Sequence, residues 1–300
     1  MKRIEATGAW PARVAWVALA LVGPDALSGA LDGRSTAVRA VVAGGLWAGW
    51  VGGLVALLVP RSAALTALRV IVPAGLAAMV AAADVDGRPG AAGVAAVALA
   101  AVATVAVLVP WVGEAWVDGS SYGPERRLPL RPPAVLSYAL VPLTWVLVVG
   151  GAVAGPLLLA AGRWVVGGVA LVAGWAVAVA GVRSLHQLSR RWIVLVPTGL
   201  VVHDTMALPE PHLFPRRSIA SLGPATVDDL PGGADGTDVV DLTAGAPGLA
   251  LRLSFAEPVE LLLRDGRSAT VTRDAAAVLI TPSRAGHLLA AAAEHRIPTA

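Results

Sequence analysis

Residues 165–204 read VVGGVALVAGWAVAVAGVRSLHQLSRRWIVLVPTGLVVHD, and the character of the chain changes inside them, near Arg183. Six long apolar stretches, separated by short charged loops, precede this point. After it, polar and apolar residues alternate over short distances, as in a small β-rich domain. The break predicts an α-helical membrane bundle of about six helices over 1–182 and a small cytosolic β-rich (α+β) domain over 183–300.

The composition excludes a purely water-soluble protein. Hydrophobic residues make up 56% of the 300 residues and charged residues only 14%, whereas a soluble domain averages about 25% charged residues. Residues 1–182 hold 12 Lys and Arg against 8 acidic residues, and residues 183–300 hold 11 against 12. Because nucleic-acid-binding domains are basic, the nearly neutral second part argues against a nucleic-acid partner. The absence of cysteine excludes disulfides and cysteine metal ligands.

Each apolar stretch has about the length that a bilayer requires, since a hydrocarbon core of about 30 Å takes about 20 helical residues. The expected helices cover about 13–31, 37–59, 64–84, 91–113, 134–155 and 163–182. Gly23-Pro24-Asp25 interrupts the first helix, and the N-terminal sequence also fits a cleavable signal peptide. We favour a retained helix, because apolar character resumes at residues 27–30.

The basic residues of the loops predict the orientation of the helices, since cytoplasmic loops carry an excess of Lys and Arg. With the N-terminus inside, the cytosolic side holds eleven of them: Lys2, Arg3, Arg13, Arg61, Arg69, Arg126, Arg127, Arg131, Arg183, Arg190 and Arg191. The outer side holds four: Arg34, Arg39, Arg88 and Arg163. We therefore expect a bacterial plasma-membrane protein whose N-terminus and C-terminal domain are both cytosolic.

Small residues at intervals of four predict close contacts between helices, because residues i and i+4 share a helix face. Gly45, Gly49 and Gly53 form such a series in the second helix, and Gly151 and Gly155 form a shorter one in the fifth. Packing within one molecule is the simpler interpretation. A homodimer contact along the second helix is the alternative.

Asp25 is the acidic residue expected deepest in the membrane, roughly 16 Å along a helix that starts near Val14. Ionisable residues at such depth are candidates for a functional role. Arg39, near the outer end of the second helix, is the expected partner of Asp25. A buried ion pair or a hydrated helix end explains Asp25 more simply than transport, because the sequence places no second carboxylate this deep.

The loop between the fourth and fifth helices, residues 114–133, contains several turn-forming pairs and is expected to be an ordered connector without helix or strand. Anionic lipid headgroups attract an arginine at the inner surface by about 1 kcal/mol. Five arginines are expected there: Arg126, Arg127, Arg131, Arg190 and Arg191. The alternative is a docking surface for the C-terminal domain or a partner, made by Asp118, Ser120, Tyr122, Glu125 and Arg126.

The β-rich part opens with RRWIVLVPTGLVVHD, residues 190–204, which predicts a hairpin turning at Pro197-Thr198-Gly199. Further strands are expected at about 217–222, 238–243, 248–255, 259–264 and 269–280, followed by a C-terminal helix. The opening resembles the bacterial pleckstrin-homology-like domains that follow membrane helices. Together with DGSSYGPERRLPLRPP, residues 118–133, it resembles uncharacterised actinobacterial multi-pass membrane proteins. The resemblance implies binding of proteins or lipid headgroups.

The sequence contains no recognisable catalytic, metal or nucleotide-binding motif. Its five histidines form neither HxxxH nor HExxH, and Gly232-Gly233 lacks the GK[ST] ending of a phosphate-binding loop. We therefore expect no catalytic residue, metal or cofactor. The predicted function is a non-enzymatic scaffold or regulatory protein whose contacts are the lipid bilayer, anionic headgroups and a protein partner or second copy. A small-solute transporter or channel is the alternative, and a membrane enzyme comes third.

Overall fold

The chain divides into two compact units. The computed structural model describes residues 8–85, 90–226, 229, 238–266 and 269–300. The helical unit comprises Met1–Trp116 and Val141–His186, and the sheet unit comprises Val117–Leu140 and Gln187–Ala300. The chain therefore passes from one unit to the other three times.

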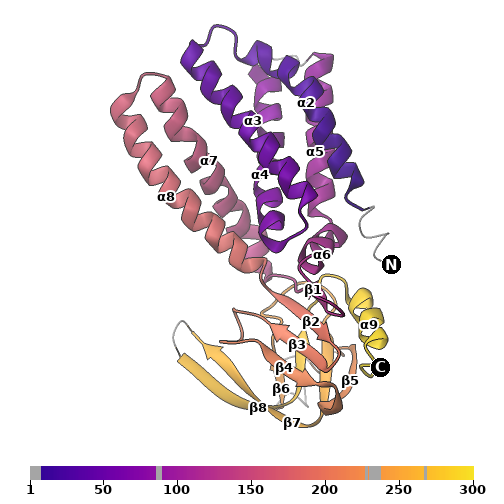
Figure 1. Cartoon of the computed structure of the whole chain (residues 1–300). Helices are drawn as coiled ribbons and strands as arrows, with labels where there is room; N and C mark the ends of the chain where they lie inside the picture. The colour runs from indigo at the N-terminus through magenta and orange to yellow at the C-terminus, as the bar shows by residue number, and fades with distance from the viewer. Residues whose placement is uncertain (1–7, 86–89, 227–228, 230–237, 267–268) are drawn as a thin grey trace. The chain divides into compact units, whose positions relative to one another are not determined.

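The helical region is built from six long apolar helices and the short α6. They are α2 (Trp10–Ala30), α3 (Thr36–Leu58), α4 (Ser62–Val85), α5 (Ala91–Leu108), α6 (Pro110–Asp118), α7 (Val141–Ala160) and α8 (Trp164–Leu188). A π-helical turn, Leu136–Leu140, leads into α7. Among the described residues, five helices are long and apolar enough to cross a membrane, namely α3, α4, α5, α7 with its π-helical turn, and α8. Figure 1 shows α7 and α8 side by side as a hairpin. The coarse prediction of an N-terminal membrane-type helical region is confirmed.

Several helices differ from the expected ones. The helix predicted over 91–113 is divided, because Pro110 cannot donate a backbone hydrogen bond and the residue before a proline is pushed out of the helical region. Val109 is accordingly extended, with φ −66° and ψ 143°. α8 continues to Leu188 rather than ending near 182. α2 contains Pro24 and is not among the five membrane-length apolar helices, so a sixth span stays a prediction.

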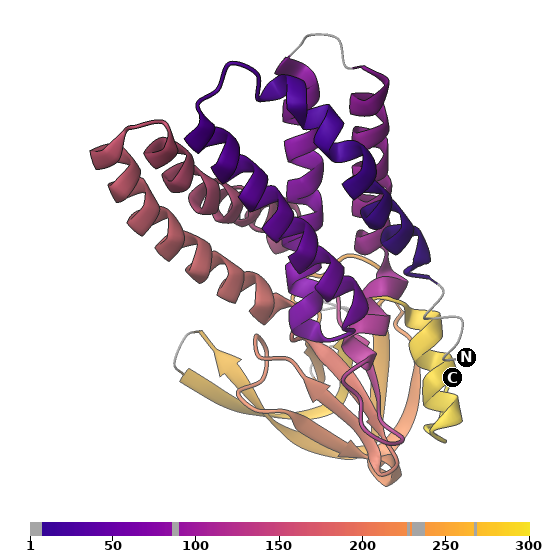
Figure 2. The ribbon, with the colours of Figure 1, turned by 45° about the horizontal axis from the view of Figure 1, so that its top comes forward.

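The sheet unit contains two four-stranded sheets and a C-terminal helix. Its elements are β1 (Arg126–Pro129), β2 (Trp192–Val196), β3 (Gly199–His203), β4 (His212–Pro215), β5 (Ile219–Pro224), β6 (Val239–Asp241), β7 (Leu251–Asp265), β8 (Ala269–Ile280) and α9 (Ala285–Glu294). The first sheet has the order β1-β2-β3-β4, and all its neighbours are antiparallel. The second has the order β5-β7-β8-β6, in which β6 runs parallel to β8. Figure 2 shows the long β7 and β8 extending together as a hairpin.

One apolar core joins the two sheets and α9. Alternate residues along the strands point inward, as the period of two requires, and Leu195, Leu200 and Val278 are fully buried. Phe214 from the first sheet stacks on Phe255 from the second, with ring centroids 4.7 Å apart. The same core includes Leu288, Ala291 and Ala292 of α9. The predicted β-rich part with a closing helix is therefore confirmed as a sheet-containing domain.

The loop between the helices is more than a connector. Its residues 126–129 form β1, which pairs with β2 in the register Arg127↔Val194 and Leu128↔Ile193. Leu128 is 2% exposed and belongs to the core of the sheet unit, so burial of this side chain supports the strand. The prediction of a loop without helix or strand is wrong here. Residues 117–140 accordingly belong to the sheet unit. The predicted domain boundary at 183 had grouped them with the helices.

Candidate interaction site on the sheet unit

A buried ion pair holds the start of the sheet unit together. Arg191 donates from Nε to Asp204 Oδ1 at 2.9 Å and from Nη2 to Asp204 Oδ2 at 2.6 Å. Both side chains are at most 1% exposed. The third guanidinium nitrogen, Nη1, donates to the backbone oxygen of Arg131 at 3.1 Å, and the Met206 N–H donates to Asp204 Oδ1 at 3.0 Å. The predicted placement of Arg191 among surface arginines does not fit this burial.

Arg131 connects the inter-helix loop to two distant parts of the same unit. Its Nη1 donates to the backbone oxygen of Pro247 at 3.2 Å, and its Nη2 donates to that of Ser283 at 3.1 Å. Gly248, with φ +119°, lies so close that a Cβ there would approach Arg131 Nη1 to 2.8 Å. Arg131 therefore acts as a structural donor between loop segments.

The loop residues whose alternative role is a docking surface for the C-terminal domain or a partner lie in one unit with the C-terminal part of the chain, and Arg126 is opposite Leu195 of β2. Several of them also organise the turn before β1. Asp118 accepts hydrogen bonds from the Arg127 N–H and the Ser121 hydroxyl, each at 2.8 Å, and forms an ion pair with Arg126 at 3.0 Å. Glu125 pairs with the Arg127 guanidinium at 3.2 Å. These contacts fasten β1 within the sheet unit, while Tyr122 at the tip of the turn is 86% exposed.

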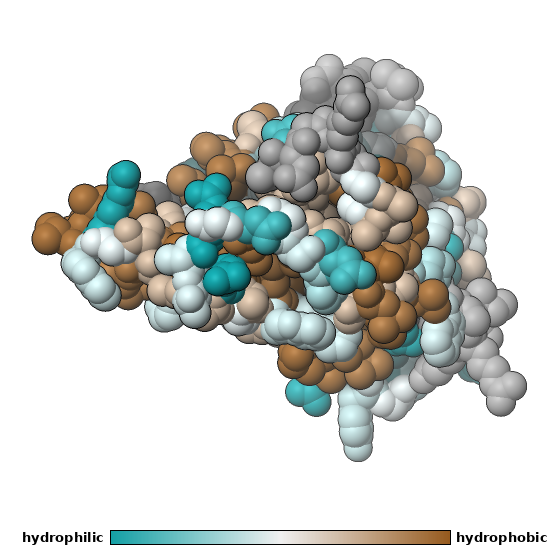
Figure 3. Space-filling view, turned by 90° about the horizontal axis from the view of Figure 1, so that it is seen from above, coloured by the Kyte–Doolittle hydropathy of each residue, from teal (hydrophilic) through white to brown (hydrophobic). Residues whose placement is uncertain are grey.

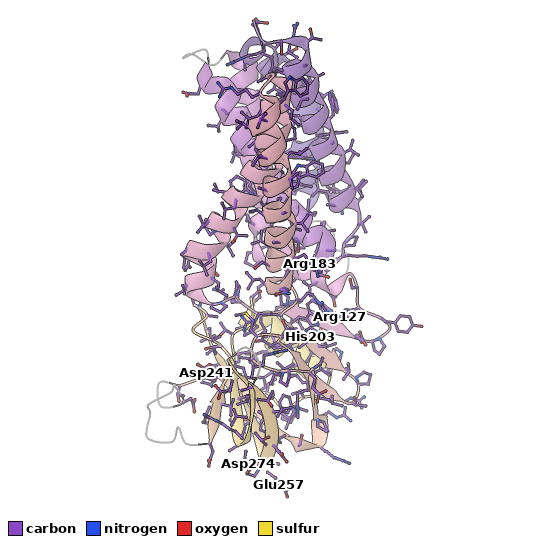
Figure 4. All side chains as sticks on the ribbon, turned by 90° about the vertical axis from the view of Figure 1, so that its left-hand side faces the viewer. Arg127, Arg183, His203, Asp241, Glu257 and Asp274 are labelled. Carbon is purple, nitrogen blue, oxygen red and sulfur yellow. The ribbon has the colours of Figure 1, made fainter. Side chains whose placement is uncertain are left out.

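An aromatic and basic group lies on the outer face of the first sheet. Trp192 and His203 are cross-strand partners in the β2–β3 hairpin, and their rings stack with centroids 4.7 Å apart. The Arg127 guanidinium lies 6.0 Å from the Trp192 ring, and His203 Nδ1 is 2.8 Å from the backbone oxygen of Arg190. Figure 4 labels Arg127 and His203 in this region. The sequence predicts a hairpin that turns at Pro197-Thr198, and the register of such a hairpin places Trp192 opposite His203. The sequence does not predict the position of Arg127.

The outer part of the β7–β8 hairpin is a two-stranded ribbon. β5 pairs with β7 only as far as Phe255, and β6 pairs with β8 only over Ala277–Leu279. Beyond these points, 259–265 pairs with 269–275, and no third strand joins them among the residues that the structure describes. This segment is called the β7–β8 ribbon below.

One face of the β7–β8 ribbon is exposed and partly acidic. Leu262, opposite Thr272, is 40% exposed, and Glu260 lies directly opposite Asp274. Figure 4 shows Asp274 and Glu257 at this end of the sheet unit. Like charges on directly opposed residues destabilise a strand pair, so this face gains nothing for folding from its acidic pair.

Among the described residues of the sheet unit, His212 and Asp229 have a shifted pKa. Burial lowers the pKa of His212 below its ordinary value of 6.5, against an opposing effect of Glu210. Hydrogen bonds from the Thr226 N–H and hydroxyl, together with the charge of Arg252, lower the pKa of Asp229 below 3.8. Asp229 closes the turn after β5 and is occupied by these partners, so it has a structural role.

The glycines predicted to mediate helix contacts differ in what lies next to their Cα atoms. A Cβ on Gly151 would lie 2.5 Å from the backbone oxygen of Gly174, and one on Gly155 would lie 2.5 Å from the backbone nitrogen of Leu171. α7 and α8 therefore meet backbone to backbone. In α3, a Cβ on Gly53 would collide with the Trp16 ring at 2.7 Å, and one on Gly49 would touch Ile71 at 4.0 Å. Gly45 faces open space among the described residues.

Asp25 and Arg39 are both exposed at one end of the helices. Within the described ranges, no ion pair joins them, so their pairing stays a prediction. Figure 3 looks onto this end and shows hydrophilic residues interrupting an otherwise largely hydrophobic surface. The predicted cytosolic residues Lys2 and Arg3, and the predicted outer residue Arg88, lie outside the described residues.

No protein-family model, curated protein or solved structure matches the chain. In the part of the chain that the structure describes, no three His, Cys, Asp or Glu side chains are grouped so that they could hold a metal ion. The resemblance to actinobacterial membrane proteins with pleckstrin-homology-like domains stays a prediction. The contacts above describe a firmly built sheet unit with an exposed ribbon.

Proposed function

We propose that this chain is a non-enzymatic membrane protein whose sheet unit is a docking platform at the inner membrane surface. The observation that carries the proposal is the pairing of β1, from the loop between α6 and α7, with β2, which follows α8. The segment between α6 and α7 and the segment after α8 thus fold into one compact unit, which gives a platform built from two separate parts of the chain.

The buried ion pair supports the same function. Arg191 and Asp204 lie in the segment that directly follows α8, and Arg191 also bonds to the loop segment through the Arg131 oxygen. The connection from Leu188 to Trp192 spans four residues, so β2 starts within about 14 Å of the end of a membrane-length helix. A partner held on the sheet unit would therefore stay close to the membrane.

The β7–β8 ribbon is the proposed docking element. No third strand lies beside residues 269–275 of β8 among the described residues, and such a strand edge is a template for association with another chain. The edge of β7 is partly occupied, since the Arg264 N–H donates to the Ala207 oxygen at 2.9 Å. The exposed Leu262 lies near the acidic pair Glu260 and Asp274. Charged groups at strand edges discourage unspecific pairing, so a specific partner has to match both charge and backbone.

The proposed topology has six spans, with α2 as the first. Trp16 of α2 donates from its indole nitrogen to the backbone oxygen of Trp50 at 2.9 Å. Trp50 of α3 in turn donates from its indole nitrogen to the backbone oxygen of Trp16 at 2.8 Å. Arg13 Nε donates to the Leu57 oxygen at 3.2 Å. This integration of α2 into the bundle favours its retention over removal as a signal peptide. The eleven-to-four distribution of basic residues supports a cytosolic sheet unit.

The test is photo-crosslinking in living cells. A photoreactive amino acid replaces Leu262 in the β7–β8 ribbon, and a matched control carries it at Thr198, an exposed residue in the β2–β3 turn. We expect a discrete adduct of defined mass from the ribbon position and not from the turn. The substitution Leu262→Asp in a chain with the photoreactive residue at nearby Thr272 should remove that adduct.

Two outcomes would count against a docking platform. One is an adduct pattern that is the same from Leu262 and Thr198. The other is a ribbon adduct that persists in the Leu262→Asp chain. Either would mean that the ribbon makes only chance encounters, provided that the variants reach the membrane in normal amounts.

A further inference from the structure

An apolar cavity of about 220 Å³ lies between α2, α3 and α4. Its walls include Trp16 and Leu27 from α2, Ala43, Leu46 and Trp50 from α3, and Met79 from α4. The cavity is open to the surroundings of the helices, since the lining residues Ala43 and Trp47 are exposed. Because α3 and α4 are membrane-length helices, those surroundings are the hydrocarbon chains of the bilayer.

The polar atoms of the two deepest tryptophans are not available to a polar ligand. The indole nitrogens of Trp16 and Trp50 donate to each other's backbone oxygens, so both rings present apolar faces. The Ser28 hydroxyl, also at the wall, donates to the Asp25 backbone oxygen at 2.7 Å. An apolar cavity of this kind stays dry and takes an apolar guest.

Arg39 lies on the face of α3 that lines the cavity. Arg39, Ala43, Leu46 and Trp50 follow the spacing i, i+4, i+7 and i+11, which puts them on one face of a helix. Arg39 is one turn, about 6 Å, nearer the start of α3 than Ala43. An exposed arginine near a helix end directs its guanidinium toward the headgroup level.

We propose that this cavity binds one acyl chain of a bilayer glycerophospholipid whose phosphate is held by Arg39. The cavity is lined almost entirely by apolar side chains, which suits part of one acyl chain. Arg39 supplies the opposite charge for a phosphate at the mouth, and the positive end of the α3 dipole acts in the same direction. This lipid site is separate from the docking function proposed for the sheet unit.

The test uses the tryptophans of the cavity as reporters. The full chain, in detergent micelles, is titrated with phosphatidylglycerol that carries bromine atoms on one acyl chain, and tryptophan fluorescence is recorded. Trp16, Trp47 and Trp50 are three of the ten tryptophans and line the cavity. We expect saturable quenching of part of the fluorescence, and a smaller quenched fraction in Trp47→Phe.

Matched variants separate the two halves of the site. Arg39→Gln should weaken the apparent affinity about tenfold, since charge-assisted hydrogen bonds are the stronger class, whereas Arg163→Gln, at another helix turn, should not change it. Ala43→Phe fills the mouth and should abolish the saturable phase, whereas Ala48→Phe, exposed on α3 outside the cavity wall, should preserve it. Circular dichroism and the melting temperature show whether each variant is folded.

Three results would overturn the proposal. Quenching that rises in proportion to the probe without saturation would mean that no site exists. Equal affinity of the Arg39→Gln and Arg163→Gln variants would remove the phosphate contact. Equally tight binding of a brominated diacylglycerol, which lacks the phosphate, would assign the cavity to any acyl chain rather than to a phospholipid.

Discussion

Arg191 shows how the surroundings of a single residue decide the role of its charge. It stands next to Arg190 in the sequence, yet Arg190 is exposed and Arg191 is buried against Asp204. Both residues precede β2, which begins at Trp192, so their difference in burial comes from their own contacts and not from strand alternation. A buried charge is tolerated only when it is paired and hydrogen-bonded, and here every guanidinium nitrogen has an acceptor.

Breaking this ion pair should strongly destabilise the sheet unit. We expect Arg191→Leu to lower the free energy of unfolding by about 3–5 kcal/mol, because it leaves the Asp204 carboxylate buried without its partner. Denaturant unfolding of the full chain in detergent, followed by circular dichroism, measures the change. The matched control Arg190→Leu, one residue away but exposed, should change stability by less than about 0.5 kcal/mol. Equal losses in the two variants would contradict the structural role of Arg191.

His212 should make part of the stability depend on pH. Burial lowers the pKa of the folded His212 below 6.5, so the unfolded chain takes up a proton first as the pH falls. The contribution of His212 is therefore fully present above about pH 6.5 and is lost as the pH falls through the folded pKa. Melting temperatures of the wild type and His212→Gln, compared at neutral and mildly acidic pH, should show a smaller loss in the variant. Parallel losses would mean that other groups cause the pH dependence.

At the scale of elements, the α7–α8 hairpin depends on close approach of two backbones. Gly151 faces Gly174, and Gly155 faces Leu171, with no room for a Cβ at either contact. Small residues permit such approach in membranes, where van der Waals contact drives helix association. The spacing of the glycines predicted a contact, and the structure identifies α8 as the neighbouring helix.

Adding one methyl group at this contact should separate the helices. We expect Gly155→Ala to destabilise the helical unit by about 1–3 kcal/mol through overpacking, whereas Gly150→Ala, which faces open space, should be neutral or stabilising by up to about 1 kcal/mol because alanine is the better helix former. Thermal unfolding of both variants in detergent provides the measurement. Identical melting temperatures would show that α7 and α8 do not touch at Gly155.

At the scale of the whole molecule, the distribution of arginine supports one orientation in the membrane. Loops rich in Lys and Arg stay on the cytoplasmic side, so we propose that the α2–α3 turn is outside and the sheet unit inside. The chain contains no cysteine, so single cysteines can report the side of the membrane without interference.

The expected labelling is asymmetric. A membrane-impermeant maleimide added to intact cells should label Asp32→Cys, in the exposed turn between α2 and α3, and should label Thr198→Cys only after permeabilisation. Mass spectrometry of the purified chain shows at the same time whether α2 is retained. Labelling of Thr198→Cys from outside would reverse the proposed orientation, and loss of the first helix would reduce the spans to five.

The sequence alone determined the features that depend on local composition and period. Twenty-residue apolar runs cross a bilayer as helices, since every backbone group must be hydrogen-bonded within the segment. α3 and α4 lie close to where the runs predicted them. The alternating pattern likewise indicated the strands after Arg190. The sequence also contains the signal for the helix break at Pro110, because proline restricts its own backbone and that of the residue before it.

Only the tertiary structure decided which distant segments meet. β1 has four residues and a partner more than sixty residues away, so no local period reveals it; burial of Leu128 in a core made by other strands supports it. The ion pair of Arg191, the cavity beside Trp16 and the open face at Gly45 depend in the same way on neighbours that the sequence does not name. Composition selects the elements, and packing between them decides which charges are buried and which surfaces stay available.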